Sequence, residues 1–353
     1  YGVLRLDLDK IRDREWDLVV LDEAQAIKNP MSGVTKAAHR TPAKARIALT
    51  GTPLENSLED LWSQFEFLNP GLLGSRSFFQ KFFVRPIMGG DQERLASLRR
   101  LTGPYILRRL KKDVAKDLPP RTDIITHVEL SEDERALYQT LMQTSRQDVL
   151  AKLEESGNVM QVLEVLLRIR QACCHPSLVP GQQAETSAKI EVLVEKLGTI
   201  KDEGQKALAF SQWTSLLNLL EPHLKRNGIS FLRLDGSTRN RQEIVDQFQD
   251  DPKIQVLIMS LKAGGVGLNL TAADHVFLLD PWWNPMIENQ AADRAHRIGR
   301  TNPVFVHKLV AQDTIEDKII QLQQSKLDLA DQTLTSGDSL QAMTKDELIQ
   351  LLQ

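Results

Sequence analysis

The sequence lacks long hydrophobic runs and has almost no cysteine. No apolar segment approaches the roughly 20 residues that a membrane-spanning helix needs, and the first residues do not form a signal-peptide pattern. The two cysteines, Cys173 and Cys174, are adjacent, so they cannot form an ordinary structural disulfide, and neither a second pair nor His175 completes a zinc site. We therefore expect an intracellular protein of a reducing compartment, without membrane contact, whose thiols are buried near a helix end.

The chain also lacks an excess of charge of one sign. It contains 44 Lys and Arg residues against 47 Asp and Glu residues, a formal net charge of −3. A protein coated in basic residues is therefore excluded, and any contact with nucleic acid must be local. At 353 residues, the chain is long enough for two or three domains, each with its own core.

A third absence concerns nucleotide binding. The pattern G-x-x-x-x-G-K-[ST], whose amides and lysine hold the phosphates of a nucleotide, occurs nowhere in the sequence. The nearest glycine cluster, KAGGVG at 262–267, is not followed by Lys-Ser or Lys-Thr. A phosphate-binding loop of this type is therefore excluded within the 353 residues.

Apolar runs and helical patterns alternate in two parts of the chain. Strands are predicted at 16–23, 46–50, 206–211, 230–235, 256–260, 275–280 and 304–310, with helices at 188–202, 214–226, 239–249 and 314–329. Such alternation is typical of parallel sheets covered by helices.

Between the two parts, from about 58 to 184, helical spacing dominates. Four aromatic residues of this segment are expected in its core, namely Phe78, Phe79, Phe82 and Phe83. An extended run at 123–130 is expected to add an edge strand to the first sheet. The basic cluster at 108–112 is interpreted equally well as a solvated face or as a phosphate contact.

Acidic residues follow the first predicted strand, WDLVVLDE. A buried parallel strand of this kind delivers Asp22 and Glu23 to the carboxyl edge of a sheet, where ligands bind in open α/β folds. One carboxylate can hold Mg²⁺ while the other orients or deprotonates water. The strand at 46–50 leads into the turn Thr50-Gly51-Thr52-Pro53 at the same edge. Each pattern is also compatible with an ordinary loop.

The stretch 258–300 predicts a strand, the glycine-rich turn, a second strand and then a helix. Asn284 is the expected N-cap, Pro285 the first helical residue and Gly299 the residue past the end. On that helix Gln290, Arg294 and Arg297 fall at i, i+4 and i+7, hence on one face. Two guanidiniums on one face suit a multiply charged anion such as a nucleoside triphosphate, although a solvated arginine face gives the same pattern.

The motifs occur in a characteristic order. They are DEAQAIKN (22–29), LTGTPLEN (49–56), FSQW (210–213), LDGST (234–238), the glycine-rich turn, DPWWNP (280–285) and RAHRIG (294–299). In this order and spacing they closely resemble the motifs of Swi/Snf-type ATP-dependent DNA translocases, the chromatin-remodeller branch of helicase superfamily two. The resemblance extends to about residue 326.

This resemblance implies an α/β fold with two RecA-like parallel-sheet lobes, the first incomplete, joined by a helical insertion. The implied parts are the end of the first lobe (1–57), an insertion with one return strand (58–184), the second or helicase C-terminal lobe (185–326) and a helical tail (327–353). It also implies a motor that uses ATP and Mg²⁺ to move along double-stranded DNA and to remodel or displace DNA-bound protein complexes.

Residue roles carried over from the family fall into four groups. In catalysis, Asp22 is implied to hold the metal, Glu23 to activate water, and Arg294 and Arg297 to act as arginine fingers. The implied nucleotide contacts are Gly265, Gly267, Asn269 and Gln290. The implied coupling residues are Gln25, Thr50, Trp282 and Trp283. The implied DNA contacts are Thr52, Ser211, Gln212, Ser237, Thr238, Ser260, Lys262 and Asn284.

Two departures from the family pattern affect these expectations. The last motif usually ends Gly-Gln, but here it ends Gly299-Arg300, which leaves the role of Arg300 open. The missing phosphate loop leads us to expect that the chain begins partway through the first lobe of a longer, DNA-dependent ATPase. Alone, it is expected to bind DNA weakly and not to hydrolyse ATP.

Other functions fit the same motifs. The chain could be a non-hydrolysing DNA-binding or regulatory module, or a motor that remodels RNA polymerase rather than nucleoprotein. If the protein is bacterial or archaeal, we expect it in the cytoplasm, associated with the nucleoid. If it is eukaryotic, we expect it in the nucleus.

Overall fold

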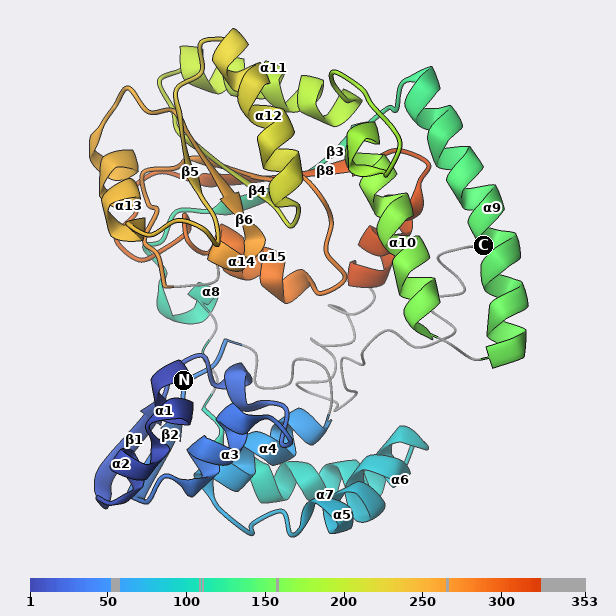
Figure 1. The fold of residues 1–353 in the computed structure, drawn as a ribbon. Helices are drawn as coiled ribbons and strands as arrows, with labels where there is room; N and C mark the ends of the chain where they lie inside the picture. The colour runs from blue at the N-terminus through green and yellow to red at the C-terminus, as the bar shows by residue number, and fades with distance from the viewer. Residues whose placement is uncertain (52–57, 108, 110, 157–158, 265–266, 325–353) are drawn as a thin grey trace. The chain divides into compact units, whose positions relative to one another are not determined.

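The computed structural model describes residues 1–51, 58–107, 109, 111–156, 159–264 and 267–324 (Figure 1). The described residues form two compact units, 1–108 and 109–324. The boundary lies within the segment 58–184, so its helices are divided between the units. The predicted helical tail at 327–353 lies outside the described residues.

The first unit contains a pair of parallel strands, β1 (Trp16–Leu21) and β2 (Ala43–Ala48). Around it lie α1 (Gly2–Leu6), α2 (Leu8–Arg12), the 3-10 helix η1 (Ala24–Ile27) and α3 (Gly33–Arg40). One face of the pair packs into a core that includes Leu21, Ile27 and Phe67. On β1, however, Leu18 is 50% and Val20 46% exposed. The prediction that this strand is buried is therefore wrong, because only one of its faces is covered.

Helices make up the rest of the first unit. They are α4 (Leu58–Leu68), α5 (Arg76–Phe79), the π-helix η2 (Gln80–Val84), α6 (Arg85–Met88), α7 (Gln92–Thr102) and the 3-10 helix η3 (Gly103–Tyr105). Phe79 and Phe83 are buried among these helices, as predicted. Phe78 and Phe82 are exposed and stack on each other with ring centroids 5.0 Å apart, so their predicted place in the core is wrong. Phe79 and Phe83 lie one turn apart on the side of the helix that faces the core. Phe78 and Phe82 lie one turn apart on another side, which faces solvent.

The second unit contains a six-stranded sheet in the order β3-β8-β7-β4-β6-β5, with every neighbouring pair parallel. The strands are β3 (Arg121–Val128), β4 (Ala207–Ser211), β5 (Phe231–Leu234), β6 (Val256–Ser260), β7 (His275–Leu278) and β8 (Val304–Ala311). β3 had been expected in the first sheet. That expectation is wrong, because β3 pairs with β8 along its whole length.

Helices cover both faces of this sheet (Figure 1). α11 (Ala188–Asp202) and α12 (Thr214–Arg226) pack on one face; α13 (Arg241–Asp250), α14 (Leu261–Gly264) and α15 (Pro285–Ala292) pack on the other. Successive side chains of β4 point to opposite faces of the sheet. Ala207 and Ala209 belong to the core beneath α11 and α12, and Leu208 and Phe210 belong to the core on the other face. The unit also contains α8 (Lys111–Val114), α9 (Glu132–Ser156), α10 (Val159–Cys174), the 3-10 helix η4 (Pro176–Leu178) and helical residues 315–324.

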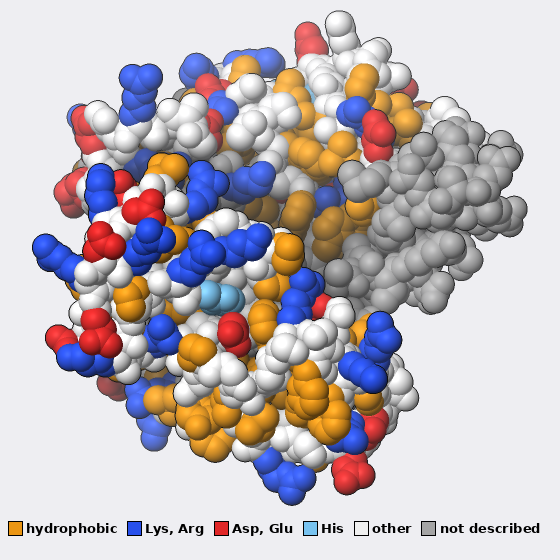
Figure 2. Space-filling model, turned by 60° about the horizontal axis from the view of Figure 1, so that its bottom comes forward, with side chains coloured by type: hydrophobic (Ala, Val, Ile, Leu, Met, Phe, Trp, Pro, Cys, Tyr) orange, Lys and Arg blue, Asp and Glu red, His pale blue; other side chains and the backbone are white. Residues whose placement is uncertain are grey.

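The surface carries charges of both signs. Figure 2 shows Lys and Arg side chains interspersed with Asp and Glu over the face in view, as the net charge of −3 suggests. Within the described part of the chain, no helix is both long and apolar enough to cross a bilayer.

Cys173 and Cys174 are buried at the end of α10, as predicted. Burial raises the pKa of both thiols above its ordinary value, so they are protonated and unreactive.

A buried ion pair ties three elements of the second unit together. Lys189 Nζ on α11 lies 2.6 Å from Glu316 Oε2, with the two side chains 3% and 1% exposed. Lys189 also donates to the carbonyl oxygen of Leu279, at 2.8 Å, and Glu316 accepts from the amide of Ala311, at 2.8 Å. The pair therefore joins α11 to the end of β7 and to the helix that follows β8.

Lys189→Met should lower the free energy of unfolding by about 3–5 kcal/mol, because it leaves the Glu316 carboxylate buried without a counter-charge. Urea denaturation followed by tryptophan fluorescence measures the loss. Lys253→Met, at an exposed position, is the control, and Lys189→Met/Glu316→Leu should recover most of the stability. A single-variant loss no larger than that of the control would contradict the assigned role.

Candidate functional site

The acidic motif lies at the carboxyl end of β1. Asp22 is exposed, and its Oδ1 accepts a hydrogen bond from the Glu23 amide at 2.9 Å. Glu23 has a φ of +49°, in the left-handed region that non-glycine residues rarely adopt. The turn therefore presents two consecutive carboxylates at the sheet edge, at a conformational cost on the order of 1–3 kcal/mol.

Two predicted coupling residues join this turn to the end of β2. Gln25 Nε2 donates to Glu23 Oε2 at 2.6 Å, and Thr50 Oγ1 donates to Gln25 Oε1 at 2.9 Å. The Leu49 amide donates to the Leu21 carbonyl at 2.7 Å, which extends the strand pairing to this point. The structure thus brings together four of the predicted residues of the first unit. The fifth, Thr52, lies outside the described residues.

The donor set at this turn fits a magnesium ion. Mg²⁺ is commonly bound by one or two carboxylates, with water and substrate phosphates completing the octahedron. Asp22 offers an exposed carboxylate of this kind, whose Oδ2 has no hydrogen-bond partner among the described residues. No cluster of three or more His, Cys, Asp or Glu ligands occurs in the described ranges, and such a site does not require one.

In the second unit, the parallel strands bring the predicted DNA contacts to one sheet edge. Ser211 ends β4, Ser260 ends β6 directly beside it, and Ser237 and Thr238 follow β5. Ser237 donates to Asp235 Oδ1 at 2.6 Å, and this bond holds the pKa of Asp235 below its ordinary value. Ser237 is exposed, so the turn after β5 faces solvent.

The predicted DNA contacts differ in accessibility. Ser211 is fully buried and Ser260 is 5% exposed; their hydroxyls accept from the amides of Trp213 and Ala263. These two serines therefore shape the turns that follow their strands, and a direct DNA contact from them stays a prediction. Lys262, by contrast, is exposed on α14, where the sequence had predicted a turn rather than a short helix.

The tryptophan motif follows β7 at the same edge. Asn284 caps α15, accepting from the Met286 amide at 3.0 Å, which confirms the predicted cap. The carboxylate of Asp280 is buried and accepts from the Gln212 amide at 3.1 and 3.2 Å. This contact joins the turn after β4 to the turn after β7.

The predicted arginine helix is shorter than expected. α15 ends at Ala292, so Gln290 is helical but Arg294 and Arg297 lie in the turns that follow, and the prediction that all three share one helical face is wrong. The physical reason is a tertiary hydrogen bond: the Arg294 carbonyl accepts from the Leu270 amide at 3.0 Å. Arg294 is 7% exposed, whereas Arg297 is exposed.

The glycine-rich segment nevertheless lies against this arginine turn (293–297). Arg297 Nη1 donates to the Leu268 carbonyl at 3.3 Å, between the predicted nucleotide contacts Gly267 and Asn269, both exposed. Gly267 has a φ of +37°, which favours glycine there. Gly265 lies outside the described residues. The acids and the arginines belong to different units, so their common nucleotide pocket stays a prediction.

A second segment holds the arginine turn from the other side. Lys111 Nζ lies 2.6 Å from Asp293 Oδ1 and donates to the His296 carbonyl at 3.1 Å. His296 Nε2 lies 2.7 Å from the Pro119 carbonyl oxygen, and Arg121 donates to Asn289 at 2.9 Å. Lys111 is exposed, as the interpretation of the basic cluster as a solvated face predicts, and its ion pair with Asp293 is an additional contact.

Arg300, whose role was open, is buried and has a structural role. Its guanidinium donates to the carbonyls of Thr271 and Ala273, each at 2.6 Å, and to Asp274 Oδ1 at 2.7 Å. It also donates to the carbonyls of Asn302 and Pro303. Arg300 therefore fastens the segment before β7 to the segment before β8.

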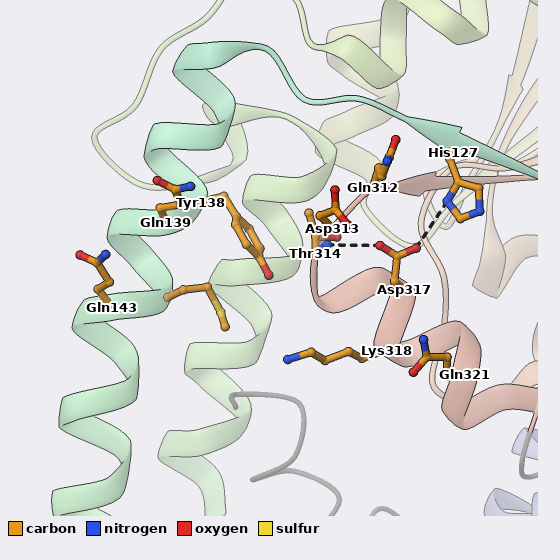
Figure 3. A pocket seen from close by; sticks show the side chains of 11 residues that line it. His127, Tyr138, Gln139, Gln143, Gln312, Asp313, Thr314, Asp317, Lys318 and Gln321 are labelled. Atoms are coloured by element: carbon orange, nitrogen blue, oxygen red, sulfur yellow. Dashed lines mark hydrogen bonds and ion pairs between the residues drawn. The ribbon is translucent and has the colours of Figure 1, made fainter.

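A cavity of about 810 Å³ lies between α9 and residues 312–321, away from these groups (Figure 3). His127 Nδ1 lies 3.4 Å from Asp317 Oδ1 at its wall, and Asp317 Oδ2 accepts from the Thr314 amide. None of the residues predicted for the functional site lines this cavity.

One residue of the site was missed from the sequence. Arg170 on α10 is 3% exposed and donates to Gln212 Oε1 and to the Pro281 carbonyl. Its signal is its position four residues after Leu166 and four before Cys174, both buried. A charge on an apolar helical face indicates a buried partner.

Comparison with known proteins gives consistent matches. The family model described as SNF2-related domain matches residues 1–178, and the helicase conserved C-terminal domain matches residues 188–299. The chain is 37% identical to a putative ATP-dependent helicase/translocase of Bacillus subtilis, YwqA, covering 99% of this chain and 39% of that protein. It is 34% identical to human SWI/SNF-related matrix-associated actin-dependent regulator of chromatin subfamily A member 1, covering 96% and 34%.

Two further similarities concern a DNA-bound structure and another relative. The solved Sulfolobus solfataricus SWI2/SNF2 ATPase core in complex with dsDNA has 35% identity and a TM-score of 0.54, covering 99% of this chain and 75% of that one. The TATA-binding protein-associated factor MOT1 of Saccharomyces cerevisiae is 32% identical, covering 99% and 22%. The chain thus spans less than half the length of these curated relatives.

Arg300→Gln should lower the free energy of unfolding by about 3–5 kcal/mol, because it leaves the largely buried Asp274 carboxylate and several carbonyls without their donor. Chemical denaturation measures this. Arg297→Gln, which removes an exposed side chain, is the matched control and should cost less than about 1 kcal/mol. Equal losses would show that Arg300 does not fasten the two segments.

The stability of the protein should depend on Asp280. Burial raises the pKa of this carboxyl from 3.8 to about 7, so the folded protein binds the proton more tightly than the unfolded chain. The contribution of Asp280 to stability is therefore greatest below about pH 4 and falls as the pH rises to about 7.

Asp280→Asn removes this dependence. Between about pH 5 and about pH 8, the variant should gain up to about 3 kcal/mol of stability relative to the unmodified protein. Urea unfolding of both proteins at the two pH values measures the difference. A difference that does not change with pH would contradict the raised pKa.

Proposed function

The chain belongs to the SNF2 family of helicase-related ATPases, and from this premise we propose that it is part of a motor driven by ATP that moves along double-stranded DNA. The relatives named above include proteins called ATP-dependent helicases and a regulator of chromatin. We propose that the motor remodels or displaces protein complexes bound to DNA. The observation that carries the proposal is the presence of both an exposed acidic turn, at the carboxyl edge of the first unit's strand pair, and an exposed arginine, beside the glycine-rich segment of the second unit.

The acidic turn supports the hydrolytic part of the proposal. Asp22 would hold Mg²⁺, which supplies charge stabilisation at the phosphates when bound. Glu23, held by Gln25 at 2.6 Å, is oriented to accept a proton from water. Gln25 also accepts a hydrogen bond from Thr50 at 2.9 Å. A shift in the position of the Glu23 carboxylate would therefore be transmitted through Gln25 to the segment after β2, which contains Thr50 and Thr52.

The polar edge of the second unit supports the DNA part. The hydroxyl groups of Ser237 and Thr238 in the turn after β5, with exposed Lys262, suit the phosphate backbone of a duplex. Such contacts carry no sequence information, as a motor that moves over any sequence requires. The dsDNA in the similar archaeal structure is consistent with this proposal.

A non-hydrolysing DNA-binding module is the alternative. Asp22, Glu23, Arg294 and Arg297 are all present, and such a module would have no use for the four together. The missing phosphate loop means that the 353 residues alone should bind duplex DNA without turning over ATP. Steady-state ATPase assays and fluorescence anisotropy test both statements.

Arg297→Ala tests the arginine finger in a longer protein that contains this chain together with a phosphate-binding loop. DNA-stimulated ATP turnover should fall by about 10³-fold or more, because an arginine finger stabilises charge in the transition state. The dissociation constant for duplex DNA should change by less than about twofold, because Arg297 is not among the residues proposed to contact DNA. Displacement of a triplex-forming strand, without separation of the duplex strands, reports translocation.

Arg226→Ala, at an exposed position on α12, is the matched control and should leave turnover and DNA binding unchanged. Equal loss of turnover and of DNA binding in Arg297→Ala would instead assign this arginine to the fold or to DNA. ATP turnover by the 353 residues alone would refute the expected dependence on a phosphate loop.

A further inference from the structure

An arginine from outside the sheet lies among three tryptophans of the candidate site. The Arg170 guanidinium carbon is 4.7 Å from the ring centroid of Trp283, 5.3 Å from that of Trp282 and 5.8 Å from that of Trp213. Arginine is attracted to the faces of aromatic rings, and the attraction grows when the charge is removed from water. With Arg170 only 3% exposed, these contacts are made in a largely dry environment.

The same guanidinium bridges two turns of the sheet edge. Nη1 donates to Gln212 Oε1 at 3.3 Å, in the turn after β4, and Nη2 donates to the Pro281 carbonyl at 2.6 Å, in the turn after β7. β4 and β7 are neighbours in the sheet, but their pairing ends at Phe210 and Leu278. Beyond that point, a planar fork with fixed donor directions can hold both turns at once.

The turns have few other links to each other. The Leu279 amide donates to the Phe210 carbonyl, and the buried Asp280 carboxylate accepts from the Gln212 amide. The side-chain donors Gln212 Nε2 and Trp213 Nε1 are buried, with no hydrogen-bond partner among the described residues. Arg170 thus adds a second side-chain link between the turns, through Gln212 Oε1 and the Pro281 carbonyl, beside the link that Asp280 makes.

We propose that Arg170 is a positioning residue, which holds the turns at 211–213 and 280–283 in one arrangement so that their DNA-binding and coupling residues form a single surface. The proposal rests on the proposed function for its DNA part. Its structural part stands on the contacts alone. In this proposal a residue of α10, a helix outside the sheet, fixes the distance between two motifs at the sheet edge.

Fluorine NMR of protein labelled with 5-fluorotryptophan tests the structural part. The chain has five tryptophans, so the three around Arg170 are compared with Trp16 and Trp62, which belong to the first unit. In Arg170→Lys, which keeps the charge but loses the planar fork, the resonances of Trp213, Trp282 and Trp283 should shift or broaden. Those of Trp16 and Trp62 should stay in place, and a far-UV circular dichroism spectrum equal to that of the unmodified protein shows that the second unit of the variant is folded.

Duplex DNA binding by the same proteins tests the functional part. We expect the dissociation constant of Arg170→Lys to rise by about tenfold at constant salt. Arg168→Lys is the matched control, because Arg168 lies on the same helix and donates to Gln171 of that helix at 3.1 Å. This control should change neither the spectrum nor the affinity. Arg170→Met serves as a second variant that removes the charge as well, and should give the larger spectral change.

The outcomes separate the two parts. Unchanged resonances of the three tryptophans in both folded Arg170 variants would overturn the proposal. Shifted resonances with unchanged DNA affinity would overturn the single DNA-binding surface while supporting the hold on the turns. If the unmodified protein does not bind duplex DNA, the proposed function fails, and the spectra still decide whether Arg170 positions the turns.

Discussion

Parallel pairing of the strands is the constraint that places the motifs directly after β4, β5, β6 and β7 of the second unit. Because neighbouring strands run the same way, each loop that follows a strand leaves at the same edge of the sheet. Register then makes neighbours of residues that are far apart in sequence, as with Ser211 and Ser260. The β1–β2 pair of the first unit obeys the same rule, which brings Asp22 to the edge where Thr50 follows β2. The order and direction of the strands therefore place these polar groups near one another, and this placement does not require a direct interaction between them.

Elements with strong local signals were predictable from the sequence. The helices Ala188–Asp202 and Thr214–Arg226 and the strand Val256–Ser260 have the predicted bounds, because apolar spacing and flanking turn residues define them locally. The extended run at 123–130 likewise indicates a strand, which the structure has at 121–128, but it does not identify the neighbouring strand. That neighbour, Val304–Ala311, lies far along the chain, and the pairing depends on how the whole unit folds. The same limit applies to the exposed face of β1.

The candidate site was predictable in its polar residues and not in the charges that support them. Asp22, Glu23 and Asn284 lie at element ends, where turn and capping chemistry marks them. Arg170 and Lys189 lie on buried helical faces, and their partners come from distant segments. Burying such charges is costly unless each is paired, so each pair fixes a distance and direction between elements that apolar packing would leave free to slide. The supporting charges thus depend on tertiary contacts, which a single sequence does not display.

The two arginines of the last motif are not equivalent in this structure. Arg294 is buried, and its backbone carbonyl accepts from Leu270, so burial and backbone both hold it in place. Arg297 is exposed, and its bond to the neutral Leu268 carbonyl is long at 3.3 Å. A phosphate oxygen is a stronger acceptor than a neutral carbonyl, because both partners of the bond then carry charge. In the proposed motor, a nucleotide would therefore draw Arg297 away from Leu268 and release the end of the glycine-rich segment.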